Sequence, residues 1–409
     1  MIPPADTSSA FRAYQDRPYV PQLDGVRAVC ILGVIASHVA DGAAWRWLSG
    51  GLGVNVFFVL SGYLITMLAI GEERARGQLS LPAFYVRRTL RIFPLYYLAL
   101  LVYCGLMFGT GWGSSLRSNF AAAIPYYLTY LQEVPYAFDV LTAGRLSPFA
   151  HSWSLGIEEK YYLVWPVLGF GSWAWRPAAR LGGTVALLVL FTATQSVGRL
   201  NPAVAAWRPE ILLYPYSHIL WGCLLAILLD DERWFRRLSW LGTRAGTVLA
   251  LLAFVVAQLA YEPLNGAVRE IVIMHAVATT ALLTSILIGG GWLRRALCAR
   301  PAVFVGRVSY GMYLFHGLGI SAAQRLIRPG SGQIGLSLLT FGLAVALTVL
   351  VAWALAVLVE RPCVRLGRRW SEAILRREDK ATATVGGVLI PRPAKSRPRG
   401  WFGVPGRAR

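Results

Sequence analysis

Charge is scarce in this sequence, and negative charge is the scarcer of the two signs. Only 15% of the 409 residues are charged, with 20 Asp and Glu against 40 Lys and Arg. Soluble domains carry roughly 25% charged residues. The hydrophobic fraction of 56% and the mean hydropathy of +0.51 complete the contrast. This balance excludes an ordinary soluble domain and indicates a membrane protein.

Cysteine is rare as well, and no two cysteines form a CxxC pair. The chain therefore lacks the pattern of a disulfide framework or a zinc site, and we expect no metal. The N-terminus is polar and lacks a cleavable signal pattern, so the first apolar span is expected to stay as an anchor. The five cysteines lie in or beside apolar runs, at Cys30, Cys104, Cys223, Cys298 and Cys363.

Long apolar runs recur from end to end of the chain. A run of about 20 apolar residues is long enough to cross a bilayer as a helix. The sequence therefore predicts an all-α, polytopic integral membrane bundle of about ten transmembrane helices. A weaker run at 119–132 contains Pro125 and is interpreted as an interfacial or re-entrant helix. The ten predicted spans lie near 26–44, 51–70, 92–109, 161–175, 183–198, 211–229, 246–260, 271–291, 302–322 and 335–359.

The net charge of +20 is spread in short clusters between these spans and in the C-terminal tail. Topology signals have this distribution, so we expect the lipid bilayer and not a nucleic acid as the partner. Most of the basic residues fall on one side if both termini are cytoplasmic. We therefore predict a multi-pass protein of the cell membrane in three parts: a cytoplasmic segment at 1–22, a membrane domain at 23–363 and a basic tail at 364–409. The tail is Pro- and Gly-rich, and we expect it to be disordered against anionic lipid.

Arg27 and His38 flank an apolar stretch in the first span. His38 follows Arg27 by eleven positions, so both side chains would lie on one helix face about 16 Å apart. A histidine deep in an apolar span is costly unless a partner or water satisfies it. The pattern indicates either a reactive imidazole or a histidine that seals a contact between helices, and the stretch alone does not decide.

Arginines gather at the start of the third span, in RRTLRIFPLYY. Arg88 and Arg91 stand three positions apart on one helix face, and Arg87 stands four positions before Arg91. Guanidinium pairs suit phosphate groups through bidentate hydrogen bonds. The alternative is ordinary anchoring of the span on its cytoplasmic side.

Two adjacent carboxylates, Glu158 and Glu159, open the span in HSWSLGIEEKYYLVWP. Acidic side chains favour a helix N-terminus, which explains one of them. The other could orient an acceptor hydroxyl or pair with Arg27. In GVNVFFVLSGYLI the small residues around Ser61 either tighten helix packing or leave room for a substrate. A third motif, SYGMYLFH, places Tyr310 and His316 in another span, where a structural hydrogen bond is the alternative role.

Taken together, the stretches LDGVRA, GVNVFFVLSGYLI, RRTLRIFPLYY, HSWSLGIEEKYYLVWP, SYGMYLFH and VERP occur in one order along the chain. In this order they resemble the membrane acyltransferase family 3, the O-acetylase-like proteins, from about Leu23 to Pro362. The sequence departs from the family pattern at Lys160, Tyr161 and Tyr63, which touches acceptor contacts more than the central chemistry. The extracellular hydrolase-like domain fused to some members is not expected here.

The resemblance implies an O-acyltransferase, most often an O-acetyltransferase. Its donor would be a cytoplasmic acyl-CoA such as acetyl-CoA, and its acceptor a hydroxyl of a cell-envelope or exported carbohydrate. Lipopolysaccharide, peptidoglycan and exopolysaccharide are all acceptors in the family, and the sequence does not choose among them. The expected site residues are His38, Arg27 and Glu158 for catalysis, Arg87, Arg88 and Arg91 for the donor, and Glu159, Ser61, Tyr310 and His316 for the acceptor.

Two rival functions remain at this point. Histidines and carboxylates within spans also serve proton-coupled carriers or flippases of lipid-linked or small polar solutes. The chain shows no internal repeat of the kind that many carriers have. An inert scaffold would leave Arg27, His38 and Glu158 without a purpose.

Overall fold

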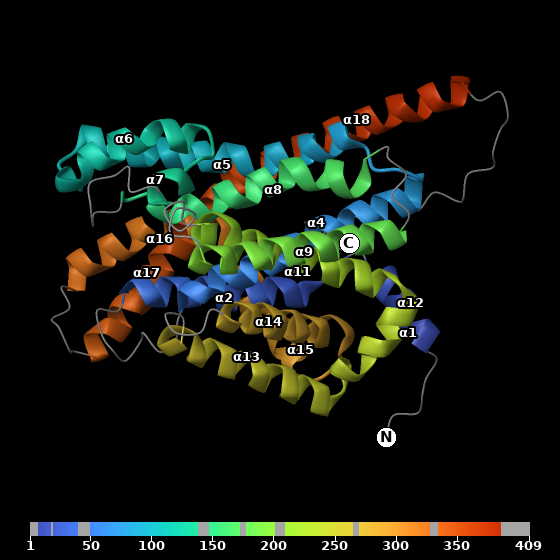
Figure 1. The fold of residues 1–409 in the computed structure, drawn as a ribbon. Helices are drawn as coiled ribbons and strands as arrows, with labels where there is room; N and C mark the ends of the chain where they lie inside the picture. Colours follow the sequence, from blue (N-terminus) through green and yellow to red (C-terminus); the bar gives the residue numbers. More distant parts are fainter. Residues whose placement is uncertain are drawn as a thin grey trace.

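Every regular element of the described chain is a helix in the computed structural model. The structure describes residues 7–17, 19–39, 50–137, 147–171, 177–200, 209–264, 270–327 and 334–385. The long helices run roughly alongside one another (Figure 1). This confirms the all-α class that the apolar runs predict.

Eleven of the described helices have 18 residues or more. They are α2 (Pro21–Val39), α4 (Gly53–Arg76), α5 (Leu81–Gly109), α8 (Trp153–Phe170), α9 (Pro177–Leu200), α11 (Pro209–Asp230), α13 (Arg244–Leu264), α14 (Glu270–Ile288), α16 (Arg300–Ile327), α17 (Ile334–Leu355) and α18 (Arg361–Val385). The shorter elements are α1 (Thr7–Gln15), η1 (Gly50–Leu52), η2 (Ser114–Leu116), α6 (Arg117–Leu128), α7 (Glu133–Ala137), η3 (Ala150–Ser152), α12 (Glu232–Leu238), η4 (Ser239–Gly242), α15 (Trp292–Leu297) and η5 (Ala356–Glu360).

Six stretches of the described chain are long and apolar enough to cross a membrane. They correspond to α2, α4, α5, α13, α14 and the continuous helix that contains α17. Four further predicted spans coincide with helices α8, α9, α11 and α16, which that criterion of length and composition does not include. The weak run at 119–132 overlaps the short helix α6.

Local signals in the sequence set the turn between α4 and α5. Gly77 ends α4 with a left-handed φ of 83°, and its N–H donates to the Glu73 carbonyl at 2.7 Å. Glycine takes this conformation without steric cost, so it is a common residue after the end of a helix. Ser80 then caps α5 by accepting a hydrogen bond from the Ala83 N–H at 3.3 Å. The two helices are thereby joined by a short turn.

Glycines allow helices α4 and α11 to pack closely along their length. A Cβ atom placed on Gly62 would lie 1.9 Å from the Ile219 carbonyl oxygen, and one on Gly222 would lie 1.9 Å from the Val59 carbonyl oxygen. Such distances are far inside van der Waals contact. Close backbone approach through small residues is a common mode of helix packing in membranes.

Helix α2 lies in the middle of the bundle and packs against α16 and α4 (Figure 1). The contact with α16 also depends on a glycine, because a Cβ on Gly306 would lie 1.9 Å from the Asp24 carbonyl oxygen. On the other side, a Cβ on Gly53 of α4 would lie 2.7 Å from the Cys30 carbonyl oxygen. These close contacts hold the helix that carries Arg27 and His38.

The chain after residue 363 departs from the expectation of disorder. Helix α18 covers Arg361–Val385 and packs along α5, while residues beyond Val385 lie outside the described part. It continues from α17 through a π-helical turn, η5, at Ala356–Glu360. An apolar-run criterion misses α18 because apolar residues are few along it and its stabilising partners lie far away in the sequence.

Candidate active site

The N-terminal part of α2 holds Arg27 in an ionic setting. The Arg27 Nη1 lies 3.6 Å from Asp24 Oδ1, three residues earlier, as expected if Asp24 holds Arg27 in place. Arg307 of α16 reaches the other carboxylate oxygen at 3.7 Å. The Tyr19 hydroxyl also donates to Asp24. Burial, followed by this hydrogen bond, raises the pKa of Tyr19 to about 12, so Tyr19 remains a neutral donor at neutral pH.

Arg88 contacts both aromatic and acidic groups where α5 meets α8. Its guanidinium lies 5.2 Å from the ring centre of Tyr162 and 5.6 Å from that of Phe84. The Tyr162 hydroxyl donates to Glu158 at 2.8 Å, and Ser61 of α4 is a further hydrogen-bonding neighbour of Glu158. The structure thus brings together three predicted site residues: Arg88, Glu158 and Ser61.

More charges from separate helices converge on the same place. Glu158 lies within electrostatic range of Arg27 and Arg88, and Arg91 within range of Arg27 and Glu360. We call this group the arginine–glutamate cluster. Its members are Arg27 of α2, Arg88 and Arg91 of α5, Glu158 and Glu159 of α8, and Glu360 of η5.

Glu360 belongs to the VERP motif but was not among the predicted site residues. Its Oε2 is buried and has no hydrogen-bond partner among the described residues. It lies at the end of the π-helical turn η5. Turns of this kind inside α-helices are often found at functional sites. The VERP motif was the only sequence signal for Glu360, because the formation of the π-helical turn η5 depends on packing.

Tyr310 and Tyr130 border the cluster next to Glu159. The Tyr310 hydroxyl donates to the Ile92 carbonyl at 2.8 Å, and both tyrosines lie within electrostatic range of Glu159. Tyr130 has a left-handed φ of 57°, which is uncommon for a residue other than glycine. Its hydroxyl is buried and has no partner among the described residues. Strained residues of this kind gather at functional sites, and no pattern in the sequence pointed to Tyr130.

Three histidines form a row that starts at His38. The ring centre of His38 lies 5.1 Å from that of His316 on α16, and His316 lies 4.6 Å from His151 on η3. We call these residues the histidine row. His151 stands in the HSWSL motif and was not predicted as a site residue. No local pattern in the sequence relates the three positions, because they are far apart along the chain.

Hydrogen bonds assign the tautomers of two of these rings. His38 Nδ1 lies 2.8 Å from the Val34 carbonyl oxygen, and His316 Nδ1 lies 2.7 Å from the Tyr313 carbonyl oxygen. A carbonyl only accepts, so in each neutral ring Nδ1 carries the proton and Nε2 keeps its lone pair. His38 is therefore set up with a basic Nε2.

The depth expected for His38 was wrong. His38 is the penultimate residue of α2 and is exposed, while His316 behind it is buried. Val39 is the last described residue of α2, so His38 lies in the final turn of the described helix and not in its middle. An imidazole in this position can be reached by a substrate.

His151 is the enclosed member of the row. Its Nε2 lies 3.2 Å from the Leu314 carbonyl oxygen. Burial, with a smaller effect of the nearby His38, lowers the pKa of His151 to about 4. His151 therefore stays neutral at physiological pH.

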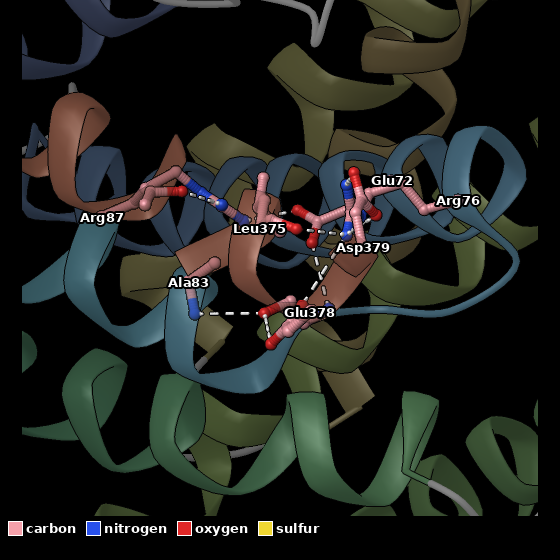
Figure 2. Close-up of polar contacts among 9 residues, drawn as sticks. Glu72, Arg76, Ala83, Arg87, Leu375, Glu378 and Asp379 are labelled. Carbon is pink, nitrogen blue, oxygen red and sulfur yellow. Dashed lines mark hydrogen bonds and ion pairs between the residues drawn. The ribbon is translucent and has the colours of Figure 1, made fainter. Parts of the chain in front are cut away.

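Arg87 lies within electrostatic range of Arg88, but its own partners lie outside the cluster. Its guanidinium pairs with Glu72 of α4 at 2.5 Å and donates to the Ser371 hydroxyl of α18 at 2.6 Å (Figure 2). The structure therefore groups Arg88 and Arg91 with the cluster and places Arg87 between α5 and α18.

The capping role considered for the glutamates does not fit α8. The helix begins at Trp153, so Glu158 is its sixth residue and no acidic side chain lies in the first turn. Ser152 at the cap position donates to the Phe149 carbonyl and makes no capping hydrogen bond. In the described ranges, no group of three or more His, Cys, Asp or Glu is arranged to hold a metal ion.

Comparison with known protein families settles the class of the chain. A family profile described as an acyltransferase domain matches residues 20–357. The chain belongs to this acyltransferase family. Its members are integral membrane proteins, in agreement with the six apolar helices that could span a membrane.

Relatives of this acyltransferase-family chain are named as O-acetyltransferases or putative O-acetyltransferases. It is 30% identical over 321 residues to the peptidoglycan O-acetyltransferase OatA of Listeria monocytogenes, which covers 73% of this chain and 49% of the relative. It is also 30% identical over 320 residues to the putative peptidoglycan O-acetyltransferase YrhL of Bacillus subtilis, covering 74% and 49%. A putative O-acetyltransferase of Staphylococcus aureus is 26% identical over 337 residues, covering 76% and 52%. The chain thus spans about half the length of these relatives, and no solved structure matches it.

Proposed function

We propose that this protein is a membrane O-acetyltransferase that moves an acetyl group from cytoplasmic acetyl-CoA to a hydroxyl of a cell-envelope carbohydrate. The observation that carries the proposal is the exposed His38 with a basic Nε2, on the same helix as an arginine of the arginine–glutamate cluster. The names of the relatives favour peptidoglycan as the acceptor. The membership of the chain in an acyltransferase family supports the reaction type.

The proposed topology has ten spans with both termini in the cytoplasm. In it, the membrane domain covers residues 23–363, and the segments 1–22 and 364–409 lie on the cytoplasmic side. The basic residues that flank the α4–α5 turn and those in α12, α15 and α18 then lie together on the cytoplasmic side. The arginine–glutamate cluster faces the cytoplasmic half of the bundle, and the histidine row lies toward the outer half.

The donor would bind through its phosphates at Arg88 and Arg91. Its pantetheine arm, which carries the thioester, would run toward the histidine row. The rise along α2 from Arg27 to His38 is about 16 Å, so phosphate binding and chemistry occupy different depths. Glu158, Glu159 and Glu360 lie within electrostatic range of arginines of the cluster. Donor phosphates would join this group through charge-assisted hydrogen bonds to Arg88 and Arg91.

In the proposed reaction His38 acts as the general base. Its Nε2 takes the proton of the acceptor hydroxyl while the oxygen attacks the thioester carbonyl carbon. The carbon–sulfur bond breaks, and the proton passes from His38 to the leaving thiolate. Arg27, Glu158 and Glu159 order the polar network behind the donor, with Ser61 and Tyr310 beside them. His316 supports His38 on the acceptor side.

Substitution of His38 tests the base assignment. His38→Gln removes the basic nitrogen, and general base catalysis contributes about 10²- to 10⁴-fold, so transfer should fall by at least about 100-fold. The measurement is formation of the O-acetyl ester and of free CoA thiol by the purified protein. His275→Gln, which changes another histidine of an apolar helix, is the control. Full transfer by the His38 variant would end the assignment, and hydrolysis or transfer by the wild type would exclude a carrier.

Substitution of the two cluster arginines of α5 tests the donor site. A hydrogen bond to a charged group contributes about 1.5–3 kcal/mol, so Arg88→Gln and Arg91→Gln should each weaken CoA binding about tenfold or more. Calorimetric titration of the purified protein with CoA measures this. Arg244→Gln, at an exposed arginine that begins α13, serves as the control. Equal affinities in all four proteins would show that Arg88 and Arg91 only anchor their helix.

A further inference from the structure

Helix α18 has two faces with different partners. One face packs along α5 and includes Gly367, Ser371 and Leu375, which are buried. The other is exposed and basic. Its exposed cations are Arg361, Arg365, Arg369, Arg376, Arg377 and Lys380, and its only exposed acidic residue is Glu372. We call these six residues the cationic face of α18.

The inner face is fixed by polar contacts to the α4–α5 turn. Arg76 pairs with Asp379 at 2.9 Å and with Glu378 at 3.7 Å, and the Ser80 hydroxyl donates to Glu378 at 2.7 Å. Arg87 adds its hydrogen bond to Ser371. Figure 2 shows these contacts joining segments about 300 positions apart in the sequence. The clasp, as we call this network, uses both acidic side chains near the end of α18 and leaves the cations facing outward.

The cationic face begins where an apolar surface ends. Helix α17 and the turn η5 after it expose apolar side chains such as Leu350 of α17 and Leu358 of η5, the latter 72% exposed, which suit lipid chains. Three residues after Leu358, Arg361 is the first exposed cation. Arg365, Arg369 and Arg376 then follow at spacings of four and seven, which place them on one stripe of the helix.

An aromatic side chain accompanies the stripe. Trp370 is 53% exposed and adjoins Arg369 in the sequence. Tryptophan is enriched at the level of lipid headgroups, where its ring meets both apolar and polar surroundings. A basic helix with exposed Trp next to a membrane span is the pattern of a segment that lies against anionic lipid.

We propose that the cationic face of α18 binds anionic phospholipid headgroups in the leaflet where α17 ends. The proposal goes beyond the acyltransferase activity, because none of the six residues belongs to the arginine–glutamate cluster or to the histidine row. Its opposite charge fits phosphate headgroups, and its start beside the apolar exposed face of α17 puts lipid next to it. Bound lipid would hold α18 from outside while the clasp holds it from inside.

Lipid binding by the purified full-length protein tests the proposal. The protein is prepared in mixed micelles of phosphatidylcholine and phosphatidylglycerol, and the lipids retained by each molecule are measured by native mass spectrometry. We expect selective retention of phosphatidylglycerol. Each basic residue near an anionic surface adds to the affinity for that surface. Arg365→Gln, Arg369→Gln and Arg376→Gln together should therefore weaken the retention of phosphatidylglycerol more than tenfold. Added salt should weaken it in the wild type.

Two further variants keep the test decisive. Lysine at the same three positions preserves the charge and should retain phosphatidylglycerol, which separates lost charge from lost folding. Glutamine at Arg233, Arg236 and Arg237, exposed residues of α12, removes the same charge elsewhere and should change retention little. No preference for phosphatidylglycerol in the wild type would overturn the proposal. So would equal losses in the α18 and α12 variants, or binding of an acidic protein to α18 that excludes lipid.

Discussion

Each imidazole of the histidine row lies next to a backbone carbonyl. His38, His316 and His151 lie within 3.2 Å of the carbonyl oxygens of Val34, Tyr313 and Leu314. A ring that donates one N–H in this way has a fixed tautomer and a fixed orientation. The order of the row therefore depends on backbone positions, which side-chain substitutions nearby change little.

His151 predicts a dependence of stability on acidity. Its pKa is about 4 in the folded protein and 6.5 as an ordinary value, so the unfolded chain binds the proton more readily. Protonation then favours unfolding, and the free energy of unfolding falls as the pH drops from about 6.5 to about 4. The contribution of neutral His151 to the free energy of unfolding is present in full above about pH 6.5. Thermal unfolding of the purified protein at a series of pH values between 4 and 8 measures it.

The variant His151→Gln isolates this group from its neighbours. The rings of His316, Tyr103 and Tyr313 pack around His151, and the charge of His38 also acts on it. We expect the melting temperature of the variant to fall less steeply between pH 6.5 and 4 than that of the wild type. Parallel curves would show that His151 already binds its proton in the folded state.

At the scale of helices, the contact between α4 and α11 depends on positions without a side chain. Gly62→Ala would place a Cβ atom 1.9 Å from the Ile219 carbonyl oxygen, which neither helix can avoid without moving. Overpacking of this kind costs about 1–3 kcal/mol. We expect a lower melting temperature of the purified protein in detergent.

Gly71→Ala in the same helix is the matched control. A Cβ on Gly71 would have no atom within 4 Å, so the substitution should stabilise α4 by about 0.5–1 kcal/mol through its higher helix propensity. Equal effects of the two substitutions would mean that α4 and α11 do not pack as closely as described.

At the scale of the molecule, the distribution of charge predicts which loops face the cytoplasm. Gln78 lies in the α4–α5 turn and Ser115 lies between α5 and α6, and both are exposed. A cysteine at position 115 should react with a membrane-impermeant maleimide on intact cells. A cysteine at position 78 should react only after the membrane is made permeable.

The natural cysteines that are not buried would be replaced by serine in this experiment, at Cys104, Cys298 and Cys363. The reverse labelling pattern would invert the topology and place Arg88 and Arg91 on the side away from acetyl-CoA. Donor binding at those arginines would then have to be abandoned.

Much of the architecture was readable from the sequence, because each long apolar run has one stable form in a bilayer. The predicted runs fall on helices, and the motif residues Arg27, Arg88, Glu158 and Ser61 do converge. The histidine row was not readable, since no local pattern relates position 151 to position 38. Helix α18 was missed for a similar reason: its clasp consists of ion pairs between residues about 300 positions apart.

The π-helical turn η5 gives the junction of α17 and α18 one residue more than a regular helix would hold. Each residue of an α-helix turns the chain by about 100°. Losing one residue between Ala356 and Glu360 would therefore swing everything downstream by more than a quarter of a revolution. Glu360 could then no longer lie beside Arg91 while Glu378 and Asp379 pair with Arg76. Insertions and deletions at this junction should accordingly be far less tolerated than single replacements.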